Sequence, residues 1–130
     1  YLTYGQFEYY PSGKIGPCAP YPPGILKNRD FREYKWIGSH LKTFKYFLFK
    51  GIHLIDFLDD KGKWLTSAAD MAFMFPMLEM VGSKITFIPQ VLYVYNNANP
   101  LRRDKIALGD QLRCDKLIRG RAKYSLLKLK

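Results

Sequence analysis

The chain has 130 residues, of which 48% are hydrophobic and 16% aromatic. This length is typical of one domain, and so apolar a chain can bury a core, which argues against intrinsic disorder. No apolar run reaches the roughly 18 to 20 residues that a membrane-spanning helix needs. The two cysteines, Cys18 and Cys114, match no metal-binding spacing. We therefore expect a cytoplasmic protein with reduced thiols.

Positive charge is concentrated at the C-terminal end of the chain. The formal net charge is +10, and residues 101–130 contribute +7 of it. A basic segment of this kind suits an anionic partner such as a membrane surface, nucleic acid or polyphosphate. A solvated helix face with no partner explains the same charge, so composition alone leaves both interpretations open.

The first third of the chain predicts a strand followed by a long loop. Residues 2–10 are aromatic and alternate, which is typical of a strand. The strand starts at once, which predicts a chain that begins inside a domain, without a secretory leader. Residues 11–28 are rich in proline and glycine and predict a structured loop without a helix.

A helix is predicted over residues 40–50, capped by Ser39 and ended by Gly51. Its core-facing positions would be Leu41, Phe44 and Leu48, which are spaced as one helical face requires. A short helical piece over residues 53–58 and a turn over residues 59–62 are expected to follow.

The main helix is predicted to begin at Thr66 or Ser67 and to end at Gly82, and Pro76 is expected to kink it or to split it in two. It carries four methionines at a spacing of three residues. At this spacing they wind around the helix and do not line one face, so they are expected to fill the core. They are Met71, Met74, Met77 and Met80.

The last third predicts two short strands and a basic helix. The strands would cover residues 85–88 and 91–95, with Pro89 between them. The helix would run over residues 104–129, weakened by two glycines. Its Lys and Arg residues alternate with leucine and isoleucine, which indicates a helix that could lie on a membrane surface.

Asp70 is the first candidate for chemistry, and its spacing from Ser67 supports two interpretations. An acid three residues after a serine forms a capping box, in which the side chains bind free N–H groups at the helix start. The same acid at a helix N-terminus could instead remove a proton from a substrate hydroxyl. Spacing alone favours the structural interpretation.

The order of four segments resembles family 2 glycosyltransferases. The segments are Trp36 to Phe44, Ser67 to Asp70, Met77 to Pro89 and Leu92 to Asn96. The resemblance covers nearly the whole chain and implies the acceptor-side, C-terminal half of a GT-A (Rossmann-like) α/β fold. It departs from the family at Ala69, where many members carry Glu. It implies that Asp70 is the general base for inverting sugar transfer from a nucleotide-sugar to an acceptor hydroxyl.

The resemblance also implies where substrates bind. Trp36, His40 and Lys42 would border the sugar and diphosphate pocket, because sugars stack well on aromatic rings. Arg102 and Arg103 would meet a nucleotide diphosphate, a lipid diphosphate acceptor or anionic lipid. A histidine such as His40 is more often a surface or core residue. The second tryptophan, Trp64, is predicted to lie in the core.

The family holds a divalent metal, Mg or Mn, through an Asp-x-Asp pair, and this chain has no such pair. We therefore expect the metal ligands and the donor site to lie outside this chain. The expected partners are a nucleotide-sugar and a glycan or lipid-linked acceptor, with no specific nucleic acid. Residues 102–130 are a candidate for peripheral contact with the inner face of the membrane.

The predicted organisation is a mixed sheet with flanking helices over residues 1–100 and a basic helical extension over residues 101–130. A different class of function remains open, a non-catalytic basic domain that binds a membrane surface or nucleic acid. The chain could also be an inactive fragment whose apolar edges aggregate.

Overall fold

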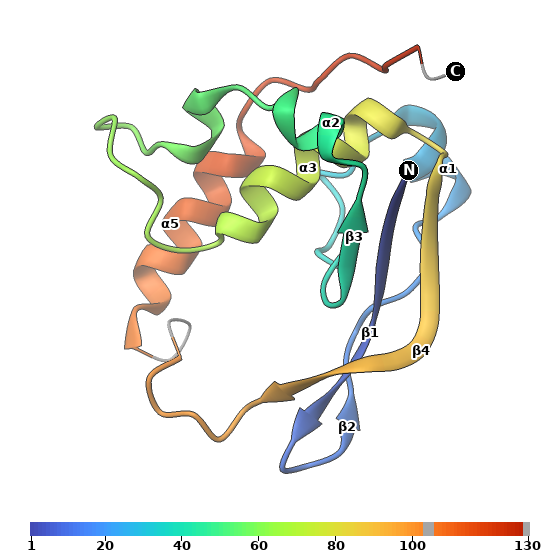
Figure 1. The fold of residues 1–130 in the computed structure, drawn as a ribbon. Helices are drawn as coiled ribbons and strands as arrows, with labels where there is room; N and C mark the ends of the chain where they lie inside the picture. Colours follow the sequence, from blue (N-terminus) through green and yellow to red (C-terminus); the bar gives the residue numbers. More distant parts are fainter. Residues whose placement is uncertain (103–105, 129–130) are drawn as a thin grey trace.

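The protein is a mixed α/β structure in which short helices pack against one small sheet. The computed structural model describes residues 1–102 and 106–128. The elements follow in the order β1, β2, α1, β3, α2, η1, α3, β4 and α5, where η1 is a 3₁₀ turn. Figure 1 shows α2, α3 and α5 gathered on one side of the strands. The predicted α/β class with a mixed sheet and flanking helices is confirmed.

The first strand, β1 (Leu2–Tyr10), is the centre of the sheet. Near its end it pairs antiparallel with β2 (Lys14–Ile15), and near its start antiparallel with β3 (Lys42–Phe44). The buried side chains of β1 include Leu2 and Tyr4, which alternate along the strand as one sheet face requires. The predicted strand over residues 2–10 is confirmed.

The fourth strand, β4 (Ile85–Asn96), runs parallel to β1 along the whole length of β1. Because β4 occupies one edge of β1, β2 and β3 share the other edge. The prediction of two strands broken at Pro89 is wrong, since β4 is continuous. The register between β1 and β4 shifts next to Pro89, where Gly5 pairs with Ile88 and Gln6 with Val91. Proline has no N–H for the ladder, so an irregularity replaces the predicted break.

The helix predicted over residues 40–50 is also wrong. This segment forms β3 and then the short helix α2 (Tyr46–Lys50), which ends at Gly51 as expected. Residues 42–44 form a strand because they pair with an edge of β1. The Lys45 N–H extends this pairing by donating to the Tyr1 carbonyl at 2.9 Å. Leu48 still reaches the core, whereas Leu41 is exposed. A strand partner has overridden a helical pattern.

The loop predicted over residues 11–28 contains regular structure that composition did not reveal. Besides β2 it holds the helix α1 (Pro23–Asn28), which has proline at its first position. Proline suits that position because the N–H it lacks would be unsatisfied there anyway. The prediction that no helix forms in this segment is therefore wrong.

The main helix, α3 (Ala69–Val81), is almost entirely buried. It begins after the 3₁₀ turn η1 (Leu54–Phe57), which matches the predicted short helical piece. Pro76 lies inside α3, and Gly82 follows its end with φ +59°. A Cβ on Gly82 would lie 2.9 Å from the side chain of Leu126, so this position requires glycine. The core-filling role predicted for all four methionines is confirmed.

The last helix, α5 (Leu108–Arg119), is much shorter than predicted, because the chain leaves the helix at Gly120. We call residues 121–128 the C-terminal strap. It crosses the end of α3, where the Leu127 N–H donates to the Met80 carbonyl at 2.9 Å. Cys114 and Ile118 of α5 are buried in the same core as α3. The basic C-terminal segment therefore packs on the rest of the chain.

A buried ion pair joins four parts of the chain at the end of α3. Arg32 donates to both carboxylate oxygens of Glu79, at 2.6 and 3.0 Å, and also to the Ile118 carbonyl at the end of α5. Glu79 accepts a further hydrogen bond from the Tyr124 N–H of the strap at 2.9 Å. Both charged side chains are almost inaccessible to solvent. This junction fixes the strap and α5 against α3.

No helix in residues 1–102 and 106–128 is both long and apolar enough to cross a bilayer.

Candidate active site

A cavity of about 490 Å³ opens beside the N-terminal end of α3. Its walls come from β1, from the loop before β3, from the start of α3, and from β4 and the segments that follow it. Four residues that the sequence singled out line this cavity: Trp36, His40, Asp70 and Arg102. Residues that lie far apart in the chain therefore meet in one hollow.

Asp70 lies in the first turn of α3, and its side chain is 35% exposed toward the cavity. The capping-box interpretation is wrong. The cap residue is Ala68, with φ +55°, and no side chain forms a hydrogen bond that caps α3. Ser67 instead donates its hydroxyl to Asp110 of α5 at 2.9 Å. Because Asp70 does not cap the helix, its carboxylate remains available for another role.

Lys42 lies behind Asp70 and does not line the cavity. Its Nζ is 3.0 Å from Oδ2 of Asp70, and its side chain is only 9% exposed. The ammonium group also lies 5.9 Å from the ring centre of Trp36 and 5.8 Å from that of Phe73. Two aromatic faces and one carboxylate thus balance a nearly buried cation. The sequence predicted that Lys42 borders the substrate pocket, whereas in the structure Lys42 binds Asp70 and does not face the cavity.

Trp36 forms part of the cavity wall and is half-buried. Its ring meets that of Phe75 edge-on, with centroids 5.3 Å apart, and Phe75 is fully buried in α3. The packing fixes the orientation of the indole while part of it faces the cavity. A ring held in this way can contact the flat face of a sugar.

His40 lies against a cluster of tyrosines on β4. Its ring centre is 4.5 Å from that of Tyr93 and 5.8 Å from that of Tyr95. Burial lowers the pKa of His40 below its ordinary value of 6.5, and the charge of Lys42 lowers it further, whereas Asp70 opposes the shift. The neutral imidazole is therefore favoured in the folded protein.

Arg102 and Arg103 are the two arginines predicted to bind substrate. The guanidinium carbon of Arg102 lies 4.8 Å above the ring of Tyr95, and Arg102 lines the cavity. This places a cation at the same wall as His40. Arg103 lies outside the described residues.

Sequence reasoning missed the aromatic residues of the sheet that complete the wall. Phe7 and Tyr9 on β1 and Tyr95 on β4 line the cavity. The register pairs Phe7 with Tyr93 and Tyr9 with Tyr95, so the rings lie on adjacent strands. Their spacing of two residues on each strand was a usable signal, because such residues share one face. The parallel pairing of the two strands could not be read from the sequence.

The start of α3 is held against α5 by Asp110. This carboxylate accepts hydrogen bonds from the hydroxyls of Thr66 and Ser67 and from the guanidinium of Arg113. The bonds from Thr66, then Ser67 and Arg113, lower the pKa of Asp110 to about 2. Because Asp70 follows this segment directly, the contact helps to set where the Asp70 carboxylate lies.

The residues described in the structure do not fit a divalent metal. No cluster of three or more His, Cys, Asp or Glu side chains in residues 1–102 and 106–128 could hold an ion. Asp59 accepts hydrogen bonds from the N–H groups of Lys61 and Lys63 in its own turn, and Asp60 pairs with Arg113. The predicted turn over residues 59–62 is thereby explained, and its acids are already engaged.

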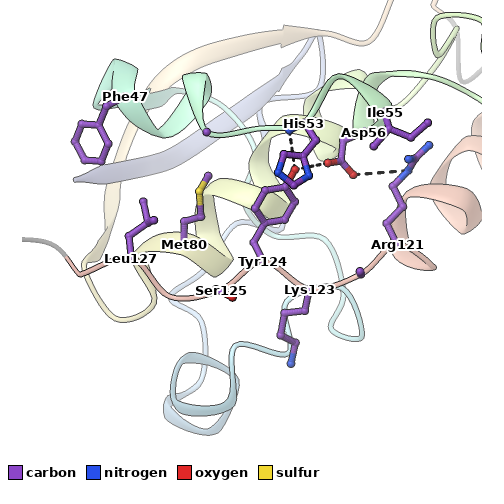
Figure 2. Close-up of a pocket in the computed structure, with 12 residues that line it drawn as sticks. Phe47, His53, Ile55, Asp56, Met80, Arg121, Lys123, Tyr124, Ser125 and Leu127 are labelled. Carbon is purple, nitrogen blue, oxygen red and sulfur yellow. Dashed lines mark hydrogen bonds and ion pairs between the residues drawn. The ribbon is translucent and has the colours of Figure 1, made fainter.

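A second cavity of about 600 Å³ lies between α2, η1 and the C-terminal strap (Figure 2). Tyr124 of the strap donates its hydroxyl to buried Asp56 and accepts the His53 N–H at 2.8 Å. Burial and then the bond to Asp56 raise the pKa of Tyr124 to about 12. Nε of Arg121 lies 3.8 Å from Asp56. Tyr124, Asp56 and the His53 N–H therefore satisfy one another, whereas Nε of Arg121 is buried with no hydrogen-bond partner among the described residues.

The chain matches no protein-family model, no curated protein and no solved structure.

Proposed function

We propose that this chain is the acceptor-side half of a GT-A type glycosyltransferase resembling family 2, with Asp70 as the general base. The observation that carries the proposal is the meeting of Asp70, Trp36, His40 and Arg102 around one cavity. Asp70 is partly exposed there and does not cap its helix. A carboxylate facing a hollow with aromatic walls is what deprotonation of a sugar hydroxyl requires.

The proposed step is a single displacement. The acceptor hydroxyl gives its proton to the Asp70 carboxylate while its oxygen bonds to the anomeric carbon of the donor. The bond from that carbon to the nucleoside diphosphate breaks, and the diphosphate leaves with the electron pair. Attack from the face opposite the leaving group inverts the anomeric configuration.

Lys42 orients the base in this proposal. It binds Oδ2 of Asp70, and Oδ1 remains to accept the proton. Since Lys42 is nearly buried and wedged between Trp36 and Phe73, the pair restricts the rotation of the carboxylate. Holding a base in one geometry is a large part of its catalytic value.

The walls of the cavity suit a sugar. Trp36 offers part of its ring to the C–H groups of a pyranose, and Arg102, which lies over the ring of Tyr95, adds a donor for its hydroxyls or for a phosphate. The proposal assigns no metal ligand to this chain. The metal ligands and the nucleotide pocket are expected in the part of the enzyme that binds the donor, with Arg102 within this chain as a candidate contact to its diphosphate.

Replacing Asp70 tests this proposal. In the enzyme that contains this chain, Asp70→Asn keeps the shape of the side chain but removes the base. We expect kcat for sugar transfer to fall by about 10²- to 10⁴-fold. Asp115→Asn on α5 is a matched control, because Asp115 pairs with Arg119 of the same helix and does not line the cavity. Transfer by Asp70→Asn at the wild-type rate, with the circular dichroism spectrum unchanged, would contradict the proposal.

A further inference from the structure

Large apolar side chains gather, exposed, on the segment from α2 to the start of α3. They are Tyr46, Phe47, Phe49, Leu54, Ile55 and Trp64, which we call the α2–η1 surface. Trp64 is 65% exposed, so the core position predicted for it is wrong. Single exposed apolar residues are ordinary, but a group of this size within twenty residues indicates an interaction surface.

Ring contacts and a shared cavity make this group continuous. Phe49 contacts Phe57 with ring centres 5.8 Å apart, and Phe57 contacts Trp64 at 6.5 Å. Phe47 and Ile55 line one cavity, which Leu127 of the strap also lines, and Figure 2 shows them at its two ends with His53 and Asp56 between them. The apolar surface therefore extends from the loop before α3 across η1 and α2 to the strap.

The charge of the same segment is positive where it is exposed. Four lysines are exposed there: Lys45, Lys50, Lys61 and Lys63. Its three acids are engaged within the protein. Asp56 is buried and bonded to Tyr124, while Asp59 binds its own turn and Asp60 pairs with Arg113. An apolar surface rimmed by lysines results.

We propose that the α2–η1 surface binds the surface of an anionic lipid membrane. Trp and Tyr prefer the level of the lipid headgroups, Phe and Leu enter the acyl boundary, and lysines meet anionic phosphates. A protein partner fits less well, because lysine is depleted and arginine enriched at protein interfaces, and residues 45–64 contain four lysines and no arginine.

This surface differs from the helix that the basic C-terminal sequence suggested. Ile118 of α5 is buried, so α5 turns an apolar side toward the core. Arg119 of α5 and two basic residues of the strap are bonded within the protein: Arg119 to Asp115, Arg121 to the Leu58 carbonyl and Lys123 to Asp30. Arginine and lysine side chains used internally contribute less to binding lipid.

Vesicle flotation tests the apolar part of the proposal. The probes are vesicles of phosphatidylcholine alone and vesicles with about one third phosphatidylglycerol. The protein is expected to float with the anionic vesicles only. Ile55→Asn combined with Trp64→Ser should lower the partition coefficient at least about tenfold. Leu108→Asn combined with Leu112→Asn is the control, because both leucines are exposed on α5, and it should bind as the wild type does.

The charged part is tested with a second pair of variants. Lys45→Glu combined with Lys50→Glu should also lower partitioning about tenfold or more. Lys14→Glu combined with Lys27→Glu changes the net charge equally, on β2 and α1, and should have a small effect. Figure 1 shows β2 at the far end of the sheet from α2. Unchanged circular dichroism in all variants excludes unfolding as the cause.

Three results would overturn the proposal. The first is that the wild-type protein fails to float with anionic vesicles. The second is that the α5 control loses binding as the α2–η1 variants do. The third is that both pairs of lysine substitutions weaken binding equally. Self-association of the wild-type protein that the Ile55 and Trp64 substitutions abolish, without vesicle binding, would identify a protein interface instead.

Discussion

Lys42 and Asp70 form the pair on which the proposed chemistry depends. The lysine is nearly buried while the carboxylate is partly solvated, so the pair stabilises the fold modestly and the position of the carboxylate more strongly. A double-mutant cycle of Lys42→Met and Asp70→Asn measures their coupling. We expect a coupling of about 1 kcal/mol in the free energy of unfolding, from urea denaturation. Additive losses would show that the two side chains do not interact in solution.

His40 should make stability depend on pH. Its pKa is lower in the fold than the ordinary 6.5, so the unfolded chain binds the proton more tightly. Stability is then complete above the unfolded pKa and is lost as the pH falls through 6.5 toward the folded value.

The measurement is the thermal midpoint of wild type and His40→Gln between about pH 5 and pH 7. The fall toward acid pH should be smaller in His40→Gln, and NMR titration of the His40 ring should give a pKa below 6.5. Equal pH dependence of the two proteins would contradict the assignment.

At the scale of single residues, the resemblance assigned substrate roles to Asp70, Trp36, His40 and Arg102, and all four line one cavity. The pairing of Lys42 with Asp70 could not be predicted. Lys42 was assigned to a helix, where its side chain would have pointed away from the core. Only the strand geometry of β3 directs it inward between two rings.

The junction at Glu79 connects α3, α5 and the strap through buried hydrogen bonds. Glu79→Gln would leave the Arg32 guanidinium buried beside a neutral group. Breaking a buried pair on one side typically costs about 3–5 kcal/mol in the free energy of unfolding. We expect a loss in this range, measured by urea denaturation at neutral pH.

The partly exposed pair Arg119–Asp115, with side chains 25% and 33% exposed, provides the comparison for Glu79. Its partners lie one helical turn apart on α5, so Asp115→Asn should cost below about 1 kcal/mol. A loss below about 1 kcal/mol in Glu79→Gln as well would mean that water reaches Arg32 and that the junction is not buried in solution.

At the scale of elements, local patterns predicted β1, η1, the end of α3 at Gly82 and the core methionines. They failed where a distant partner decided the conformation. The segment over residues 40–50 has helical spacing, but β1 recruits residues 42–44 as a strand. The basic C-terminal pattern predicts a long helix, but residues 121–128 are extended. The Tyr124 N–H binds Glu79 and the Leu127 N–H binds the Met80 carbonyl, which holds this strap against α3.

At the scale of the whole molecule, the predicted elements and the family resemblance indicated the α/β class, but not the parallel pairing of β1 with β4. These strands are separated by most of the chain, and their pairing creates the aromatic wall of the Asp70 cavity. The arrangement of the two cavities follows from α3, which has one at each end. Met71 lines the cavity near Asp70, and Met80 lines the cavity beside the strap.

The central claim is that a sugar binds in the cavity at Asp70, and the four methionines of α3 can report on it. The most direct measurement is a titration of the protein, labelled with ¹³C in its methionine methyl groups, with neutral mono- and disaccharides. We predict that the NMR signal of Met71 shifts, while those of Met80 and of the core residues Met74 and Met77 stay in place. A shift confined to Met80, or no shift with any sugar, would contradict the account.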